Sequence, residues 1–160
     1  MGLEIERKWL PNGNAYRQMI KGAPFTEIEQ RYLCTEPVIR VRIDGGSYYL
    51  TYKGKGHVER EEYNLPLTRE AYEKLSQKCE GRVIRKNRYR LPLSDGLTLE
   101  IDEFLGELSP LVIFEIEFSS RADAERYQAP QYFGKEVTED TRYTNAYLSS
   151  AGIDVDTIMC

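Results

Sequence analysis

Apolar and charged residues alternate with a period of two along much of the chain. In the opening segment MGLEIERKWL, charged residues stand at Glu4, Glu6 and Lys8, and apolar residues fall in the gaps. Such alternation is typical of a β-strand with one apolar face and one charged face. The same pattern predicts strands over 3–10, 27–35, 38–44, 47–54, 58–66, 82–92, 97–104 and 111–119.

Turn residues separate these segments by short connections, as at Glu36-Pro37, Gly45-Gly46 and Ser109-Pro110. Short connections predict hairpins, and hairpins predict a largely antiparallel sheet. Apolar residues at helical spacing predict helices over 12–22, 67–79 and 141–152, and a weaker pattern predicts one over 121–127. Thr68 is expected to cap the second helix, and Gly152 is expected to close the third.

The charges on the predicted strands are sorted by sign. Two strands carry basic rows, one with Arg40 and Arg42 and the other with Lys86, Arg88 and Arg90. Other strands carry acidic pairs, such as Glu100 with Asp102 and Glu115 with Glu117. Residues i and i+2 of a strand lie about 7 Å apart. Two like charges at that distance repel by about 0.6 kcal/mol in water and about 2.4 kcal/mol at an effective dielectric near 20. A half-exposed sheet also alternates apolar and charged residues, but it does not predict this sorting.

A closed barrel explains the sorting. The sequence therefore predicts one α+β domain over residues 1–160, mainly antiparallel β, in which an eight-stranded barrel encloses the charges and helices cover its apolar outside. Paired carboxylates are suitable ligands for Mg²⁺ or Mn²⁺. Rows of Arg and Lys are suitable for a polyphosphate anion. A metal, an anion and both charge signs in one cavity are the components of phosphoryl transfer.

In their order along the chain, these motifs resemble the triphosphate tunnel metalloenzymes, also called the CYTH domain superfamily. Glu4, Glu6 and Lys8 match the E-x-E-x-K signature, and the resemblance covers nearly the whole chain. It implies an eight-stranded tunnel and a divalent cation, Mg²⁺ or Mn²⁺. The residues implied to bind the metal are Glu4, Glu6, Glu62, Glu100, Asp102, Glu115 and Glu117. Those implied to bind phosphate are Lys8, Arg40, Arg42, Lys53, Arg60, Lys86, Arg88 and Lys135.

The resemblance also implies a reaction, the hydrolysis of a small triphosphate by metal-assisted attack of water, with no covalent enzyme intermediate. Its catalytic group would be Glu4, Glu6, Lys8, Glu62 and Glu117. Lys55 and Arg90 are expected to be ordinary surface or rim charges. His57, the single histidine, is expected to be exposed in a glycine-flanked turn.

The short chain favours inorganic tripolyphosphate as the substrate. One alternative is an adenylate cyclase of the CYTH type, which converts ATP to cyclic AMP. It is disfavoured because members of that branch often carry a histidine and an aromatic residue before the signature, and only three residues precede Glu4. Another is a non-catalytic polyphosphate sensor, which would tolerate loss of carboxylates that this chain retains.

Bulk properties narrow the setting. The net charge of −4 argues against a nonspecific nucleic-acid partner. No apolar run reaches the ~20 residues of a membrane span, so no membrane partner is expected. The three cysteines lack metal-ligand spacing and form a poor disulfide framework. A cytoplasmic protein is expected, and the sequence leaves monomer and homodimer equally open.

Overall fold

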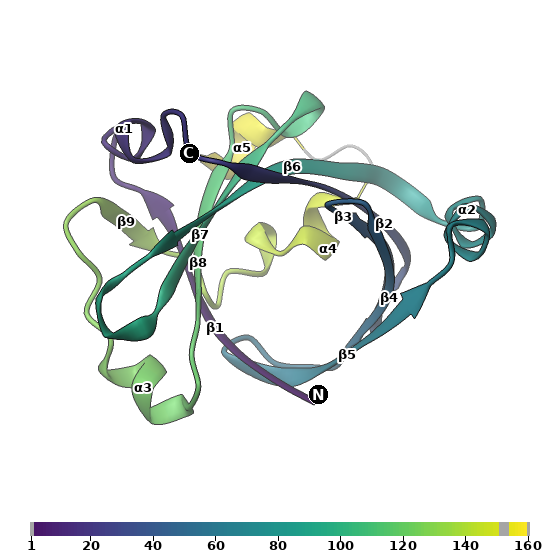
Figure 1. The fold of residues 1–160 in the computed structure, drawn as a ribbon, viewed down its shortest axis with the longest axis horizontal. Helices are drawn as coiled ribbons and strands as arrows, with labels where there is room; N and C mark the ends of the chain where they lie inside the picture. Colours follow the sequence, from purple (N-terminus) through teal and green to yellow (C-terminus); the bar gives the residue numbers. More distant parts are fainter. Residues whose placement is uncertain (1, 151–153, 160) are drawn as a thin grey trace.

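Eight antiparallel strands close into a barrel in the computed structural model, which describes residues 2–150 and 154–159 (Figure 1). Around the ring the strands follow the order β5-β4-β3-β2-β6-β7-β8-β1, and β5 then pairs with β1. That closing pairing joins Gly2–Ile5 to Glu59–Glu62. The strands are β1 (Gly2–Pro11), β2 (Phe25–Thr35), β3 (Val38–Asp44), β4 (Ser47–Lys53), β5 (Glu59–Leu67), β6 (Glu80–Pro92), β7 (Thr98–Phe104) and β8 (Val112–Glu117). The predicted strands and the closed barrel are confirmed.

The helices are short. They are α1 (Tyr16–Ile20), α2 (Arg69–Ser76), α3 (Arg121–Arg126), α4 (Asn145–Leu148) and α5 (Val155–Met159), and a 3₁₀ turn over Thr141–Tyr143 precedes α4. Thr68 caps α2 as predicted, because its hydroxyl accepts a hydrogen bond from the Ala71 N–H at 3.1 Å. The predicted helix over 141–152 is shorter than expected, and Gly152 lies outside the described residues.

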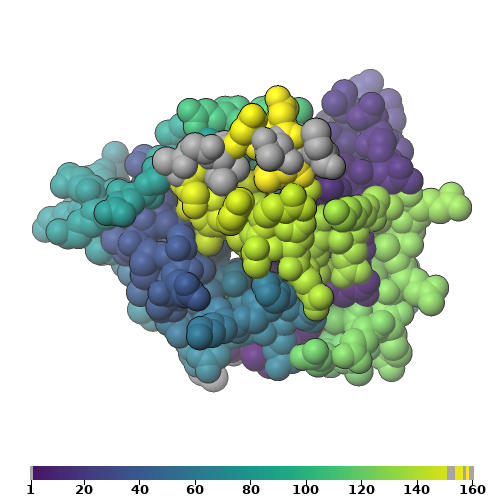
Figure 2. Space-filling model, turned by 180° about the vertical axis from the view of Figure 1, so that it is seen from behind, coloured from purple at the N-terminus to yellow at the C-terminus, as the bar shows by residue number. Residues whose placement is uncertain are grey.

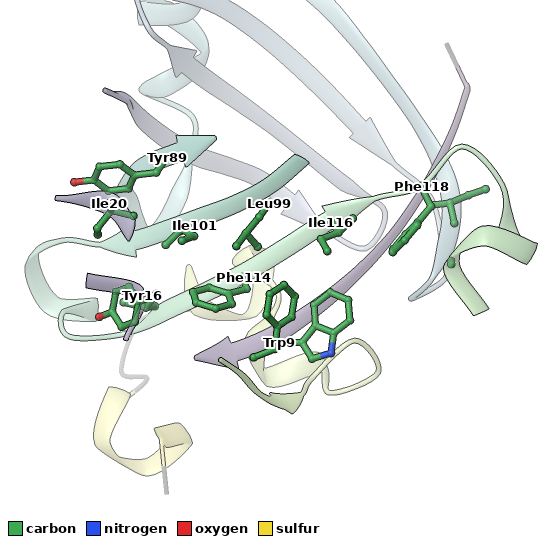
Figure 3. Packing of buried hydrophobic residues seen from close by; sticks show 13 residues of the cluster. Trp9, Tyr16, Ile20, Tyr89, Leu99, Ile101, Phe114, Ile116 and Phe118 are labelled. Carbon is green, nitrogen blue, oxygen red and sulfur yellow. The ribbon is translucent and has the colours of Figure 1, made fainter. Parts of the chain in front are cut away.

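The outer face of β1, β7 and β8 carries a large apolar core (Figure 3). Trp9 and Phe114 are almost fully buried there, and the Trp9 ring meets Phe133 edge-on at 5.0 Å between centroids. Elements that pack on this face are α1, α3 and β9 (Phe133–Glu136), a short strand that pairs with β1 outside the ring. Each fully buried aromatic or aliphatic side chain contributes roughly 1.5–3 kcal/mol, so this core fixes β1 and β8 in place.

A second apolar core fills one end of the barrel from within. The lumen-facing residues Ile84, Phe104 and Ile113 pack there against Tyr143 and Leu148 of the C-terminal segment. In the view down the barrel, α4 lies inside the ring of strands (Figure 1), and from behind the C-terminal segment covers that end (Figure 2). The expectation that all helices pack outside was therefore wrong for α4, because the apolar end of the lumen needs an apolar partner.

Two elements, β9 and α5, were not predicted. The alternation of β9 is too short to stand out, since it covers only four residues. Within the described residues, none of the helices has the length and apolar character needed to cross a membrane.

Candidate active site

The barrel encloses a polar cavity of about 320 Å³. Each of the eight barrel strands contributes lining residues, and α4 adds Asn145 and Ala146. Lining residues from the predicted set are Glu4, Glu6, Lys8, Arg40, Arg42, Lys53, Arg60, Glu62, Lys86, Arg88, Glu100, Glu115 and Glu117. The inward orientation of these charges follows from the strand period, because their outward neighbours belong to the outer apolar core or meet solvent.

Two predicted residues are not among the lining residues. Lys135 is exposed on β9, outside the ring, so the structure does not bring it to the cavity. Asp102 faces inward but lies behind the cavity surface, only 1% exposed, where it pairs with Lys86 at 2.8 Å and with Arg88 at 2.7 Å. Burial opposes its ionisation, but Arg88 and Lys86 together hold the pKa of Asp102 well below its ordinary value. Asp102 therefore acts as the buried counter-ion of Lys86 and Arg88.

Arg90, Lys55 and His57 also lie away from the cavity lining. The Arg90 side chain is 42% exposed and pairs with Glu100 at 3.4 Å. Lys55 and His57 are exposed in the turn between β4 and β5. All three predictions are confirmed.

An acidic wall, formed by Glu4 and Glu6 of β1 with Glu115 and Glu117 of β8, occupies one side of the cavity. Glu6 stands directly opposite Glu117 in the strand register. Like charges directly opposite each other destabilise a sheet unless a cation separates them. Such a wall is stable only with positive charge close by.

Lys8 and Lys53 supply internal positive charge to the acidic wall. The Lys8 ammonium lies 3.6 Å from Glu6 and 3.5 Å from Glu115. Burial works against the charge on Lys8, yet the two carboxylates raise the pKa of its ammonium above the usual value. Lys53 donates to Glu4 at 2.9 Å and lies 3.1 Å from Glu62.

Glu62, on the adjacent strand β5, is kept ionised by its neighbours. Burial opposes its charge, but hydrogen bonding with Glu4, the charge of Lys53 and a hydrogen bond from Asn64 lower the pKa of Glu62 to about 2. The Asn64 amide donates to Glu62 at 2.9 Å. Glu62 is therefore available as an anionic ligand at any physiological pH.

Glu117 differs from the other carboxylates of the acidic wall. In the part of the chain that the structure describes, no lysine or arginine forms an ion pair with it. Partial burial, followed by repulsion from Glu4, Glu62 and Glu6, raises the pKa of Glu117 to about 7. Its side chain lines the cavity while remaining exposed to solvent.

A basic wall lies across the lumen, formed by Arg40 and Arg42 of β3 with Lys86 of β6. Arg40 is 6% exposed, and among the described residues its Nε atom has no hydrogen-bond acceptor. Burial, then the charges of Arg40 and Arg88, lower the pKa of Arg42 to about 9. Burial likewise lowers the pKa of Lys86 to about 8, although Asp102 opposes the shift. Both groups stay mostly protonated at neutral pH, and a bound anion would stabilise their charged forms further.

The acidic wall has the donor chemistry of a divalent-cation site. Across residues 2–150 and 154–159, no three Asp, Glu, His or Cys side chains are gathered closely enough to form a complete metal site as they stand. However, Glu6 and Glu117 face each other in register, and Glu117 lacks an ion-pair partner among these residues. A hard divalent cation between them would relieve the repulsion and receive oxygen ligands.

A family comparison agrees with this geometry. The model of the CYTH domain matches residues 2–143. The chain belongs to the CYTH domain family.

Two similar proteins align with this chain over almost the full length of both sequences. An inorganic triphosphatase from Nitrosomonas europaea is 38% identical over 153 residues, which is 91% of this chain and 96% of that protein. An inorganic triphosphatase from Acetivibrio thermocellus is 40% identical over 152 residues, covering 92% and 94%. A crystal structure of an inorganic triphosphatase superposes with a TM-score of 0.64 at 36% identity, covering 94% of this chain and 96% of that one.

A more distant CYTH structure shares the fold alone. An adenylyl cyclase candidate from Hippeastrum, with a dominant triphosphatase activity, superposes with a TM-score of 0.59 at 14% identity, covering 78% of this chain and 83% of that one.

Sequence reasoning missed several residues of the cavity region, among them Asn145, which lines the cavity, and Gln30, which is buried behind its surface. Gln30 lies on β2 between Ile28 and Tyr32 on the lumen side, so its row has no charge to attract attention. Asn145 lies on α4, which was expected outside the barrel. The available signal was a polar residue alternating with bulky apolar ones on an otherwise ordinary strand.

Proposed function

We propose that this protein is a divalent-metal-dependent triphosphatase that hydrolyses inorganic tripolyphosphate to pyrophosphate and orthophosphate. One observation carries the proposal: an acidic wall and a basic wall face each other across one enclosed cavity, and the basic wall contains a buried arginine with an unfilled donor, Arg40. Full-length similarity to two inorganic triphosphatases supports the choice of substrate.

The basic wall would hold the phosphate chain. Guanidinium groups of Arg40 and Arg42 match phosphate oxygens geometrically, and Lys86 adds a compact charge. The cavity of about 320 Å³ is at the small end of ligand sites, which are roughly 300–1,000 Å³. Its size suits a compact polyanion without an appended base.

The acidic wall would hold Mg²⁺ or Mn²⁺, through Glu6, Glu115 and Glu117 with help from Glu4 and Glu62. Bound there, the ion supplies Lewis-acid polarisation and charge neutralisation of phosphate oxygens. Lys8, kept protonated by its carboxylate neighbours, donates to a phosphate oxygen and stabilises the charge that develops on it.

The Glu117 carboxylate, which has no ion-pair partner among the described residues, would orient the attacking water molecule and accept its proton. In the hydrolysis, the water oxygen bonds to the terminal phosphorus, the anhydride P–O bond breaks, and pyrophosphate leaves.

The test uses purified protein with tripolyphosphate, ATP or thiamine triphosphate, each with Mg²⁺, Mn²⁺ or EDTA. We expect orthophosphate release chiefly from tripolyphosphate, and none in EDTA. Pyrophosphate with cyclic AMP from ATP would instead indicate the cyclase reaction. Tight metal-independent binding without turnover would indicate a sensor and overturn the proposal.

A further inference from the structure

Two neutral amides connect the cations of the basic wall. Gln30, fully buried on β2, accepts hydrogen bonds from Nε of Arg42 at 2.7 Å and from Nη2 of the same guanidinium. The Nε2 amide of Gln30 donates to Oδ1 of Asn145 at 3.1 Å. Lys86 donates to that same Oδ1 at 2.9 Å. The chain Arg42–Gln30–Asn145–Lys86 thus connects three barrel strands, β3, β2 and β6, through α4.

Only one orientation of each amide satisfies this chain. Lysine and arginine can donate but never accept, so both amide oxygens must point at a cation. The NH₂ group of Gln30 then points to Asn145, whose side-chain oxygen accepts hydrogen bonds from both Gln30 and Lys86. The orientation of the two amides is therefore fixed, and each amide oxygen holds one of the two cations in addition to its carboxylate partner.

The neutrality of these amides matters for an anion site. A carboxylate would hold the same cations but would cancel their charge, as Asp102 does in part for Lys86. An amide oxygen accepts a charge-assisted hydrogen bond and leaves the positive charge in place. These hydrogen bonds also restrict two long side chains in the folded protein, so less rotamer entropy is lost when the anion binds.

We propose that Gln30 and Asn145 are positioning residues that hold the guanidinium of Arg42 and the ammonium of Lys86 ready for the phosphate chain. The proposal rests on the triphosphatase function above. It assigns α4 a role in substrate binding, because Asn145 of α4 positions the ammonium of Lys86 on the barrel wall.

The experiment measures kcat and KM for tripolyphosphate in Gln30→Met and Asn145→Leu, two substitutions that keep side-chain volume. We expect KM to rise about tenfold in each, the size of one lost charge-assisted hydrogen bond, with kcat within about threefold of wild type. Thermal melts establish that each variant is folded. Unchanged KM in both folded variants would overturn the inference.

A double-mutant test separates positioning from general support of the fold. Asn145→Leu is repeated in a Lys86→Met background, and Gln30→Met in an Arg42→Met background. If the amides act through these cations, each second substitution changes KM by less than about twofold. The same tenfold effect in both backgrounds would show that the amides act elsewhere and would overturn the inference.

Gln30→Glu tests the importance of neutrality. Its carboxylate still accepts from Arg42 but cancels the charge, so we expect KM to rise at least as much as in Gln30→Met. A wild-type KM in Gln30→Glu would overturn the positioning role. Wild-type protein inactive on tripolyphosphate with every metal would overturn the proposed function itself, a result distinct from active protein with unaffected variants.

Discussion

The acidic and basic walls of the cavity deal with crowded charge in opposite ways. On the acidic wall, carboxylates are paired with internal cations, as Glu4 is with Lys53 and Glu115 with Lys8. On the basic wall, Arg42 is held by a neutral amide at 2.7 Å and has its carboxylate partner, Asp44, farther away at 3.5 Å, while Arg40 keeps an unfilled donor among the described residues. The acidic wall therefore carries internal cations that a metal can supplement, whereas the basic wall keeps its positive charge available to an anion.

The largest expected effect comes from removing one charge of the acidic wall. Glu115→Gln deletes a carboxylate that faces both Lys8 and Arg88, although each keeps another carboxylate partner. We expect turnover of tripolyphosphate to fall by roughly 10²–10³-fold with the fold intact, because charge stabilisation in the transition state is lost. Steady-state kinetics and thermal melts check this.

Glu103→Gln is the matched control for that variant. Glu103 lies on β7 with its side chain outside the barrel, where it accepts a hydrogen bond from Tyr89 that glutamine can also accept. Its activity is expected to match wild type. Equal activity of Glu115→Gln and Glu103→Gln would contradict a metal-binding acidic wall.

A weaker effect is expected on the basic wall. Arg40→Met removes the buried donor without leaving a carboxylate unpaired, since no ion pair of Arg40 occurs in the described ranges. We expect KM for tripolyphosphate to rise about 10- to 100-fold while kcat changes less, as for a group that binds substrate and transition state alike. Lys55→Met, at an exposed turn, is the control. A selective loss of kcat in Arg40→Met would reverse the assignment of the two walls.

The smallest effect concerns stability. The folded pKa of Glu117, about 7, lies above the ordinary value of 4.5, so the folded state binds more protons than the unfolded state between these values. Wild-type stability without metal therefore falls as pH rises through that window. Glu117→Gln removes this loss, and we expect it to stabilise the metal-free protein at pH 8 by about 0.5–1 kcal/mol, a figure reduced for solvent screening.

Urea unfolding of wild type and Glu117→Gln at pH 5 and pH 8 measures this difference. The gap between the two proteins is expected to widen at the higher pH, while the variant loses turnover. A gap that is constant with pH would mean that repulsion around Glu117 is relieved in some other way.

The sequence predicted the charged rows well because sorted charge is costly on an open surface. Arg40, Arg42, Glu115 and Glu117 could be placed on a shared interior face from the strand period and Coulomb repulsion alone. The position of each cation relative to its partners could not be predicted, because hydrogen bonds between strands that are distant in sequence depend on the strand register. Lys135 shows the limit, since a basic residue on a short outer strand looked equivalent to those inside.

The apolar end of the lumen has a sequence signal that is visible only when neighbouring strands are compared. Ile84, Phe104 and Ile113 each stand two residues from a charged member of their row. They lie at the same end of three neighbouring strands, as their register shows for Phe104 opposite Lys86 and Ile113 opposite Asp102. Only the pairing of strands reveals that these three residues meet, and hence that α4 belongs inside.

Strand β1 carries the E-x-E-x-K motif and also closes the barrel. It pairs with β5 on one edge and with β8 on the other, so its second edge is satisfied only when residues near 117 have joined the sheet. Such distant pairings slow folding, and unpaired edges promote aggregation until they form. Glu4 and Glu6 lie on this strand and are buried only in the closed ring, so a chain with an open ring would lack the acidic wall.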